Sequence, residues 1–248
     1  MGRSSFALFN LFLIVGTVLV GMRMFLRANP DVSNVRGSRL LGPSIRGCYF
    51  AILDPFEALF VRWRVTPDAI TMAQLAGSLV CAAAFAAGLV YTAGFLVLAS
   101  GTLDILDGRL ARRNGIASKA GAFFDSVVDR YCEFIVYIGM IIFFQSGWPV
   151  WAVIVALFGG NMVSYTRARA EGLGQSCEVG MLQRPERFVI LGFGAIFSSI
   201  LTHVAGGHHE LLEIVVLFLA VFTNLTALQR FFHVRRALQR ANGMSGHG

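Results

Sequence analysis

The sequence predicts an all-α polytopic membrane protein built on a six-helix transmembrane core. Hydrophobic residues make up 56% of the 248 positions and charged residues only 14%, whereas soluble domains average about 25% charged residues. The mean hydropathy is +0.66. A helix needs about 20 apolar residues to cross the hydrocarbon layer of a bilayer. Six stretches of about that length follow one another: 69–90, 93–112, 121–145, 148–168, 187–206 and 211–232.

The chain before residue 45 is predicted to form a membrane anchor followed by a linker. Arg3 precedes an apolar run from Phe6 to Met22, which resembles a signal peptide. The small-residue cleavage site of a signal peptide does not follow it. We therefore expect an extra N-terminal membrane helix over 5–22, with a helix lying on the membrane surface as the alternative. Residues 28–44 then form the linker, and the first domain segment is 1–44.

The segment 45–60 is predicted to be an amphipathic juxtamembrane helix on the cytoplasmic surface. Helical spacing brings its apolar side chains onto one stripe. The stripe consists of Ile45, Tyr49, Ile52, Leu53, Phe56, Leu59 and Phe60. Pro55 would kink this helix or begin a new one. The transmembrane domain is then expected over 45–240, and the tail 241–248 is expected to be disordered.

The turns between the six predicted spans alternate in charge. Three of them carry no Lys or Arg: 91–92, 146–147 and 207–210. The basic residues gather at the opposite ends of the spans, at 62–64, 109–119, 167–187 and 230–240. Because cytoplasmic loops of membrane proteins are enriched in Lys and Arg, both ends of the six-helix core are expected in the cytoplasm. We predict an integral protein of the cytoplasmic (inner) membrane with its site facing the cytoplasm.

Arginine accounts for 20 of the 21 basic residues, and the exception is Lys119. Arginine binds phosphate through two parallel hydrogen bonds, although a GC-rich genome would favour the same residue. The arginines flank apolar spans instead of forming a continuous stripe with aromatic residues, which argues against a nucleic-acid partner. The four cysteines are scattered without a CxxC pair, so no disulfide framework or zinc site is indicated.

Four aspartates stand at helical spacing around the turn between the second and third predicted spans. Asp104 and Asp107 share one helical face with Gly108, and Asp125 and Asp129 share a face of the next helix. Two antiparallel helices would bring the four carboxylates together. Such a set of oxygen ligands suits Mg²⁺ or Mn²⁺. The alternative is that these are solvated acids at helix ends, but acids near a membrane are costly and usually functional.

The pattern D-x2-D-G-x2-A-R-x8-G-x3-D-x3-D, from Asp104 to Asp129, resembles the signature of the CDP-alcohol phosphotransferase (CDP-alcohol phosphatidyltransferase) family. The resemblance implies phospholipid synthesis, in which an alcohol attacks a CDP-linked lipid and CMP is released. It implies that Asp104, Asp107 and Asp125 hold two divalent ions. Asp129 would contact a metal and accept the proton of the attacking hydroxyl.

A nucleotide site is expected beside the aspartates. Gly108 leaves room for the nucleotide, Arg112 lies one turn further along and can reach a phosphate, and Ser118 could donate a hydrogen bond. The family uses the start of the first core helix for the cytidine, and many relatives have asparagine at the position of Asp68. The same stretch is also expected to serve as a helix N-cap. The expected CDP-lipid site is Asp68, Ala69, Ile70, Thr71, Gly108, Arg112 and Ser118.

The acceptor site is expected from a second resemblance. Residues 164–174 and 180–187 look like the corresponding stretches of phosphatidylinositol phosphate synthases, and Arg167, Arg184 and Arg187 could clamp an acceptor phosphate. A belt of positive charge at the membrane would also place arginines here. The acids Glu171 and Glu186 could orient the guanidinium groups, and Phe124-Asp125-Ser126 differs from the Leu-Asp-Pro run of phosphatidylglycerophosphate synthases.

The resemblance therefore implies CDP-diacylglycerol as donor and inositol 1-phosphate as acceptor. Glycerol 3-phosphate, inositol and serine are alternative acceptors. A different class, a cation transporter, would also place carboxylates and arginines in the membrane. Transporters usually hold such sites near mid-membrane between repeated or broken helices, and no duplication is visible here. Members of the family are commonly homodimers, so a homodimer is expected.

Overall fold

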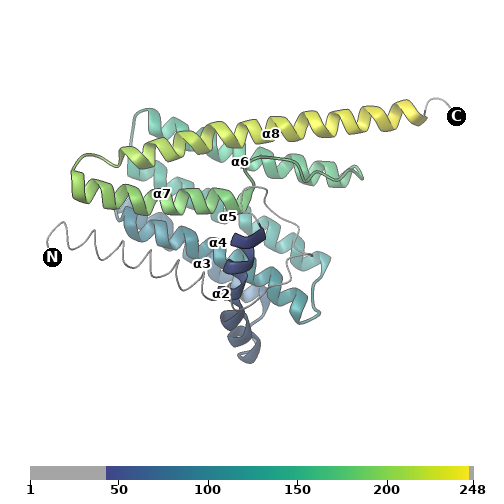
Figure 1. Cartoon of the computed structure of the whole chain (residues 1–248), viewed down its shortest axis with the longest axis horizontal. Coiled ribbons are helices and arrows are strands. Elements are labelled where there is room, and N and C mark those ends of the chain that lie inside the picture. The colour runs from purple at the N-terminus through teal and green to yellow at the C-terminus, as the bar shows by residue number, and fades with distance from the viewer. Residues whose placement is uncertain (1–42, 246–248) are drawn as a thin grey trace.

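The computed structural model describes residues 43–245, and all of its regular elements are helices (Figure 1). The predicted anchor over 5–22 and most of the linker lie outside the described residues. The helices are α2 (Pro43–Arg62), α3 (Pro67–Ala86), α4 (Val90–Arg113), α5 (Lys119–Phe144), α6 (Trp148–Gly172), α7 (Arg184–Ala205) and α8 (Glu210–Ser245). The all-α prediction is confirmed.

Helices α3 to α8 correspond one by one to the six predicted spans. Five of them are long and apolar enough to cross a membrane. Helix α5 differs because Asp129, Arg130 and Glu133 lie within its membrane-length stretch. Helix α8 continues to Ser245, past the residue 240 at which we expected the folded domain to end, and no proline interrupts this extension.

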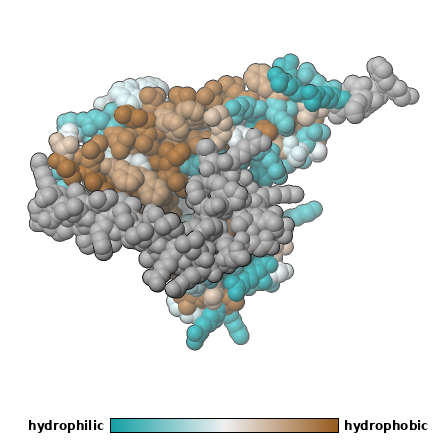
Figure 2. Space-filling model, viewed as in Figure 1, coloured by the Kyte–Doolittle hydropathy of each residue, from teal (hydrophilic) through white to brown (hydrophobic). Residues whose placement is uncertain are grey.

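The apolar surface matches a bilayer environment. Large hydrophobic side chains such as Phe158, Ile214 and Phe231 are exposed on α6 and α8. In Figure 2 hydrophobic surface gathers over α7 and the first half of α8, while the C-terminal part of α8 is hydrophilic. A soluble protein would not leave so much apolar surface in contact with water. The protein is therefore an integral membrane protein.

Helix α2 covers the segment 45–60 that was predicted to be an amphipathic helix. It packs on α4 through Leu53, through Tyr49, whose hydroxyl donates a 2.7 Å hydrogen bond to Thr102, and through Glu57. Phe56, a member of the predicted stripe, is 52% exposed, as a side chain that faces lipid would be. The buried position of Glu57 has a physical reason, because α4 presents two arginines, Arg109 and Arg113, that pair with its carboxylate at 2.6 and 3.2 Å. Helix α2 runs through Pro55 as one helix.

Side chains at the helix starts explain where α3 and α5 begin. Thr66 is the N-cap of α3 and its side chain accepts a hydrogen bond from the backbone N–H of Ala69, with Pro67 in the first turn. Ser118 caps α5 in the same way by accepting from Gly121 at 3.0 Å. Such caps satisfy N–H groups that have no partner within the helix. They fix the register of the two helices that carry the polar side chains of the site.

Helices α3 and α5 approach closely because α5 has a glycine, Gly139, where it faces Ala82 of α3. A Cβ at Gly139 would lie 2.5 Å from both Cα and O of Ala82. These are backbone atoms, which cannot move aside without shifting a helix. The short interhelical distance brings polar side chains of α3 to the aspartates of α5.

Replacing Gly139 with alanine should therefore destabilise the protein by about 1–3 kcal/mol, as overpacking of a tight core does. Thermal unfolding of the purified protein in detergent would measure the loss. Gly77→Ala is the matched control on α3, because nothing lies within 4 Å of a Cβ there and alanine is the better helix former by about 1 kcal/mol. Equal unfolding temperatures for the two variants would contradict the close contact.

Candidate active site

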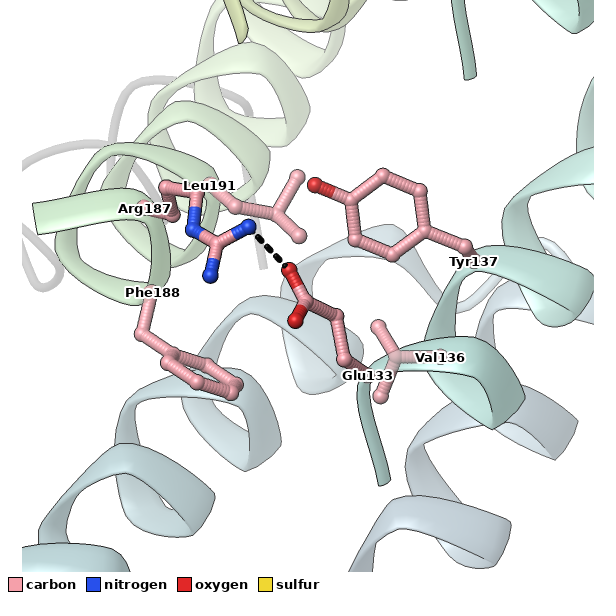
Figure 3. A pocket seen from close by; sticks show the side chains of 6 residues that line it. All are labelled: Glu133, Val136, Tyr137, Arg187, Phe188 and Leu191. Carbon is pink, nitrogen blue, oxygen red and sulfur yellow. Dashed lines mark ion pairs between the residues drawn. The ribbon is translucent and has the colours of Figure 1, made fainter. Parts of the chain in front are cut away.

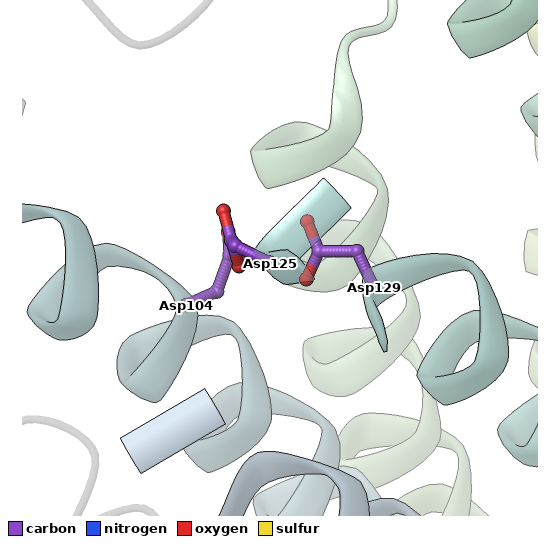
Figure 4. Close-up of side chains that lie close together, drawn as sticks. All are labelled: Asp104, Asp125 and Asp129. Carbon is purple, nitrogen blue, oxygen red and sulfur yellow. The ribbon is translucent and has the colours of Figure 1, made fainter. Parts of the chain in front are cut away.

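Three carboxylates converge between α4 and α5. Asp104, Asp125 and Asp129 each offer an oxygen, and these oxygens lie within 4.8 Å of one another (Figure 4). Asp129 is buried, whereas Asp104 and Asp125 are partly exposed. The convergence predicted from helical spacing is confirmed for these three aspartates.

The fourth aspartate is held by α3. Asp107 is buried, and one of its carboxylate oxygens accepts a 2.8 Å hydrogen bond from the hydroxyl of Thr71. Thr71 also donates to the carbonyl of Pro67, one turn earlier. Thr71 therefore fixes the orientation of the Asp107 carboxylate, and the role of Asp107 as a metal ligand stays a prediction.

Asp129 has polar partners from two further helices. Gln74 of α3 donates to one carboxylate oxygen at 3.3 Å. Arg184, the first residue of α7, forms ion pairs with Asp129 and, at 2.6 Å, with Asp104. It also donates to the backbone carbonyl of Asp129 at 3.4 Å. One guanidinium group thus lies against two of the three clustered carboxylates.

A second buried ion pair lies one helical turn further along α5. Glu133 and Arg187 are 2.7 Å apart and almost fully buried, and they line a small pocket together with Tyr137 and Phe188 (Figure 3). Gly160 of α6 leaves the space for this pair. A Cβ there would lie 2.8 Å from the Glu133 carboxylate and closer still to the Arg187 guanidinium.

The donor set fits a divalent cation. Among the described residues, one guanidinium group, that of Arg184, forms ion pairs with the cluster of Asp104, Asp125 and Asp129. One buried oxygen of Asp125 has no hydrogen-bond partner there. An excess of buried negative charge is costly unless it is neutralised. Ligands made only of oxygen select Mg²⁺ or Mn²⁺ over softer metals.

The expected nucleotide residues border the aspartates on the side of α3 and the α4–α5 turn. Ile70 and Thr71 are buried, while Asp68 and Ala69 are exposed in the first turn of α3. Arg112 is exposed and folds back beside Gly108: a Cβ at Gly108 would lie 3.3 Å from the guanidinium.

Ser118 serves as the cap of α5. Its hydroxyl oxygen accepts from Gly121, and its hydrogen can still be donated. The structure thus gives Ser118 a structural role beside its predicted contact with the nucleotide, which stays a prediction.

The three acceptor arginines have different surroundings. From α7, Arg184 pairs with Asp104 and Asp129, and Arg187 pairs with Glu133. Arg167 lies at the exposed end of α6 and pairs with Glu171 at 2.8 Å. Glu171 therefore orients a guanidinium, as expected. The two carboxylate oxygens of Glu186 have no hydrogen-bond partner among the described residues, so its expected pairing with an arginine is not seen, and the acid that pairs with Arg187 is Glu133.

Sequence reasoning missed Gln74 and Glu133. Both carry a signal that could have been found. Glu133 lies four residues after Asp129 and continues the spacing of the aspartates on α5, and Gln74 lies three residues after Thr71 on α3. A polar residue at such a position in a membrane span faces the inside of the bundle more often than lipid.

Residues 64–226 match the family model described as CDP-alcohol phosphatidyltransferase. A phosphatidylinositol phosphate synthase of Streptomyces avermitilis is 32% identical over 212 residues, which cover 83% of this chain and 87% of the relative. An archaetidylinositol phosphate synthase of Methanothermobacter thermautotrophicus is 34% identical over 172 residues, covering 69% of this chain and 84% of that protein.

Solved structures show the same fold. The crystal structure of Mycobacterium tuberculosis phosphatidylinositol phosphate synthase with CDP-DAG bound matches with a TM-score of 0.65 and 28% identity, over 73% of this chain and 92% of that one. The structure of that enzyme in complex with manganese and citrate matches with a TM-score of 0.64 and 27% identity, over 73% of this chain and 87% of the other.

Proposed function

Because this chain belongs to the CDP-alcohol phosphatidyltransferase family, we propose that it transfers the phosphatidyl group of CDP-diacylglycerol to inositol 1-phosphate and releases CMP. The observation that carries the choice of acceptor is the position of two arginines of α7: Arg184 lies against the clustered aspartates, and Arg187 lies against Glu133, one helical turn further along α5. Guanidinium groups there can bind an anionic acceptor next to the reacting phosphate. The relatives named as inositol phosphate lipid synthases support the same choice.

Two divalent ions, Mg²⁺ or Mn²⁺, are expected at Asp104, Asp125 and Asp129, with Asp107 as the fourth ligand. The ions would neutralise charge on the two phosphates of the CDP-lipid. The convergence of the carboxylates and the manganese in the related structure support this assignment.

Asp129 is proposed as the general base. Its carboxylate accepts the proton of the acceptor hydroxyl, whose oxygen forms a bond to the phosphorus attached to diacylglycerol. The bond from that phosphorus to the bridging oxygen breaks, and its electron pair leaves on CMP. Gln74 supports this role because its hydrogen bond restrains the Asp129 carboxylate, and a base acts best when it is held in position.

The CMP moiety is proposed to bind at the start of α3 and along α4, at the residues expected from the sequence. Thr71 links this half of the site to Asp107. Arg112 can reach a phosphate from the end of α4 because its side chain is exposed. The acceptor approaches from the α7 side, where Arg184 and Arg187 lie.

We place the protein in the cytoplasmic membrane with the aspartates at the cytoplasmic side, since the arginine-rich helix ends lie at that side. A homodimer is proposed from the family resemblance. Crosslinking of the purified protein in nanodiscs would test the dimer.

A substrate panel tests the function. Purified protein, CDP-diacylglycerol and Mn²⁺ are combined with inositol 1-phosphate, inositol, glycerol 3-phosphate or serine, and CMP release is measured. We expect inositol 1-phosphate to be the preferred acceptor. Preference for another alcohol would reassign the acceptor within the family. If no CMP were released with any of the four alcohols, the acceptor would lie outside the panel. Cation flux without CMP release would support the transporter alternative.

The contact of Arg184 with the aspartates makes a separate prediction about metal affinity. Arg184 pairs with carboxylate oxygens of Asp104 and Asp129. A divalent cation held by these two aspartates would compete with Arg184 for them, so Arg184→Gln should bind Mn²⁺ more tightly. A charge-assisted hydrogen bond contributes about 1.5–3 kcal/mol, and we expect at least about a tenfold lower Kd for Mn²⁺.

Electron paramagnetic resonance of free Mn²⁺ in a titration of the purified protein gives this Kd without turnover. Arg169→Gln is the control, because Arg169 is an exposed arginine of α6. Unchanged or weaker Mn²⁺ binding by Arg184→Gln would show that the two cations do not compete.

A further inference from the structure

One buried carboxylate joins α2 to the end of α4. Glu57 of α2 is only 4% exposed. Its Oε2 accepts a 2.6 Å hydrogen bond from Nε of Arg109, and its Oε1 accepts a 3.2 Å hydrogen bond from Nη1 of Arg113. Both arginines belong to the last two turns of α4. Because a buried carboxylate is stable only where opposite charge neutralises it, Glu57 and the two arginines form one bridge between the helices.

Two further side chains of α2 hold the guanidinium group of Arg109. The centre of the Phe50 ring lies 4.8 Å from its Cζ, and Asp54 pairs with its Nη2 at 2.6 Å. Phe50, Asp54 and Glu57 follow the spacing of one helical face. The side chain of Asp54 is 58% exposed, and exposed ion pairs contribute little to stability. The buried Glu57 is therefore the main anchor of Arg109.

The bridge holds α4 from the side opposite to α3. On the α3 side, Thr71 donates a 2.8 Å hydrogen bond to Asp107. Successive residues of an α-helix are about 100° apart around its axis, so Arg109 points about 160° away from Asp107. Contacts on two nearly opposite sides restrain the rotation of α4 about its own axis. That rotation decides where the face with Asp104, Asp107 and Gly108 points.

Helix α2 lies apart from the residues that are proposed to bind the acceptor. Figure 1 shows α2 on the side of the bundle away from α8, and among the described helices it packs chiefly on α4. Arg184 and Arg187 belong to α7 instead. Loss of the bridge should therefore affect the donor half of the site, which is formed by the start of α3 and the end of α4.

We propose that Glu57 is a positioning residue for the donor half of the site. By bridging to Arg109 and Arg113, it fixes the rotation of the end of α4. That end carries Asp107 and Gly108, so the bridge holds a carboxylate and the adjoining glycine in place for the nucleotide. This inference rests on the proposed binding of CDP-diacylglycerol at these residues. It gives α2 a role in the site besides lying at the membrane surface.

A double-mutant cycle separates positioning from direct contact with the lipid. Glu57→Gln keeps the size of the side chain and removes its charge, Arg109→Gln removes the partner, and the double variant removes both charges. If Arg109 acts only through the bridge, the second substitution adds little to the first. If Arg109 bound the donor phosphates itself, Arg109→Gln would add its own loss to that of Glu57→Gln. Removal of both members of a buried pair also disturbs folding less than removal of one.

The experiment combines hydrogen–deuterium exchange of the full-length protein in nanodiscs with equilibrium binding of CDP-diacylglycerol. Asp54→Asn is the matched control, because it removes an exposed carboxylate from the same guanidinium group. We expect faster amide exchange across 103–113 in both single variants at Glu57 and Arg109 and in the double variant. Their Kd for CDP-diacylglycerol should rise about tenfold, the size expected for loss of one charge-assisted contact. Asp54→Asn should remain near the wild type in both measurements.

Steady-state kinetics complete the test. The KM for the acceptor preferred in the substrate panel should stay near the wild-type value in the Glu57 and Arg109 variants, which also shows that they fold. An equal rise in acceptor KM and donor Kd would overturn the proposal, because the bridge would then support the whole site and not its donor half.

Three other results would also overturn the proposal. They are wild-type exchange and donor Kd in Glu57→Gln, faster exchange with an unchanged donor Kd, and additive losses in the double variant. An equal loss in Asp54→Asn would assign the effect to the surface charge of α2 instead of the buried bridge. If no alcohol of the panel gave CMP release, the proposed function would fail, while amide exchange and donor binding would still decide whether Glu57 positions α4.

Discussion

Replacing Asp129 with asparagine should lower turnover by about 10²–10⁴-fold, the range for loss of a general base, while CDP-diacylglycerol still binds. Asparagine has nearly the same size, and its carbonyl oxygen can still accept the hydrogen bond from Gln74. It cannot take up the proton of the attacking hydroxyl. Because Asp129 also belongs to the carboxylate cluster, a weaker cation site should push the loss to the upper end of this range.

Two measurements separate these contributions. Turnover is measured by CMP release at saturating Mn²⁺, and donor affinity by equilibrium binding of CDP-diacylglycerol in detergent micelles. Asp54→Asn serves as the control, since Asp54 is an exposed carboxylate of α2 that pairs with Arg109 outside the cluster. Near-normal turnover of Asp129→Asn would assign the base to another group.

The aspartate cluster could be predicted from the sequence because its geometry is local. Asp104 and Asp107 share a face of one helix, and Asp125 and Asp129 share a face of the next. Helical periodicity gives these two faces, and a short turn joins the ends of α4 and α5, while α3 packs on both helices. Length and apolar composition predicted six spans; all six are helices, and five of them, without α5, are long and apolar enough to cross a membrane.

The partners of these aspartates could not be predicted in the same way because they depend on packing between distant helices. The pairing of Glu133 with Arg187 requires α7 to lie beside α5 and requires Gly160 of α6 to leave space. Periodicity gives the face of each helix but not which helix lies opposite. For this reason the sequence suggested Glu186 as a partner, a neighbour in the chain, while the structure pairs Arg187 with an acid 54 positions away.

Helix α2 shows the same limit. Its apolar stripe predicted an amphipathic surface helix, and the exposure of Phe56 agrees with a stripe that faces lipid, but the stripe did not predict that Glu57 is buried against α4. The arginines of α4 that pair with Glu57 decide which side of α2 faces the bundle. A hydrophobic stripe cannot reveal a partner of opposite charge on another helix.

Removing an acceptor arginine should raise the apparent KM for inositol 1-phosphate by about 10- to 150-fold, because a charge-assisted contact contributes about 1.5–3 kcal/mol. Arg184→Ala is expected to show the full effect, since Arg184 lies directly against Asp104 and Asp129. Arg167→Ala is expected at the lower end, because Arg167 is half exposed and salt-bridged to Glu171. The KM for CDP-diacylglycerol should change little in both variants.

Arg187 needs a different variant because its removal would leave the Glu133 carboxylate buried without its partner, which costs about 3–5 kcal/mol. The double variant Glu133→Gln/Arg187→Gln removes both charges and keeps a hydrogen-bonding pair. If Arg187 binds the acceptor phosphate, the double variant should lose acceptor affinity while Glu133→Gln alone loses less.

Arg169→Ala is the control for all of these variants, as an exposed arginine on the same helix as Arg167. A belt of positive charge predicts that Arg167, Arg184 and Arg169 can each be replaced with the same small effect on the amount of inserted protein and none on acceptor KM. It also predicts no advantage of inositol 1-phosphate over inositol. These two results together would rule out the phosphorylated acceptor, whereas a selective loss in Arg184→Ala would support it, because among these three arginines only Arg184 contacts the clustered carboxylates in the described part of the chain.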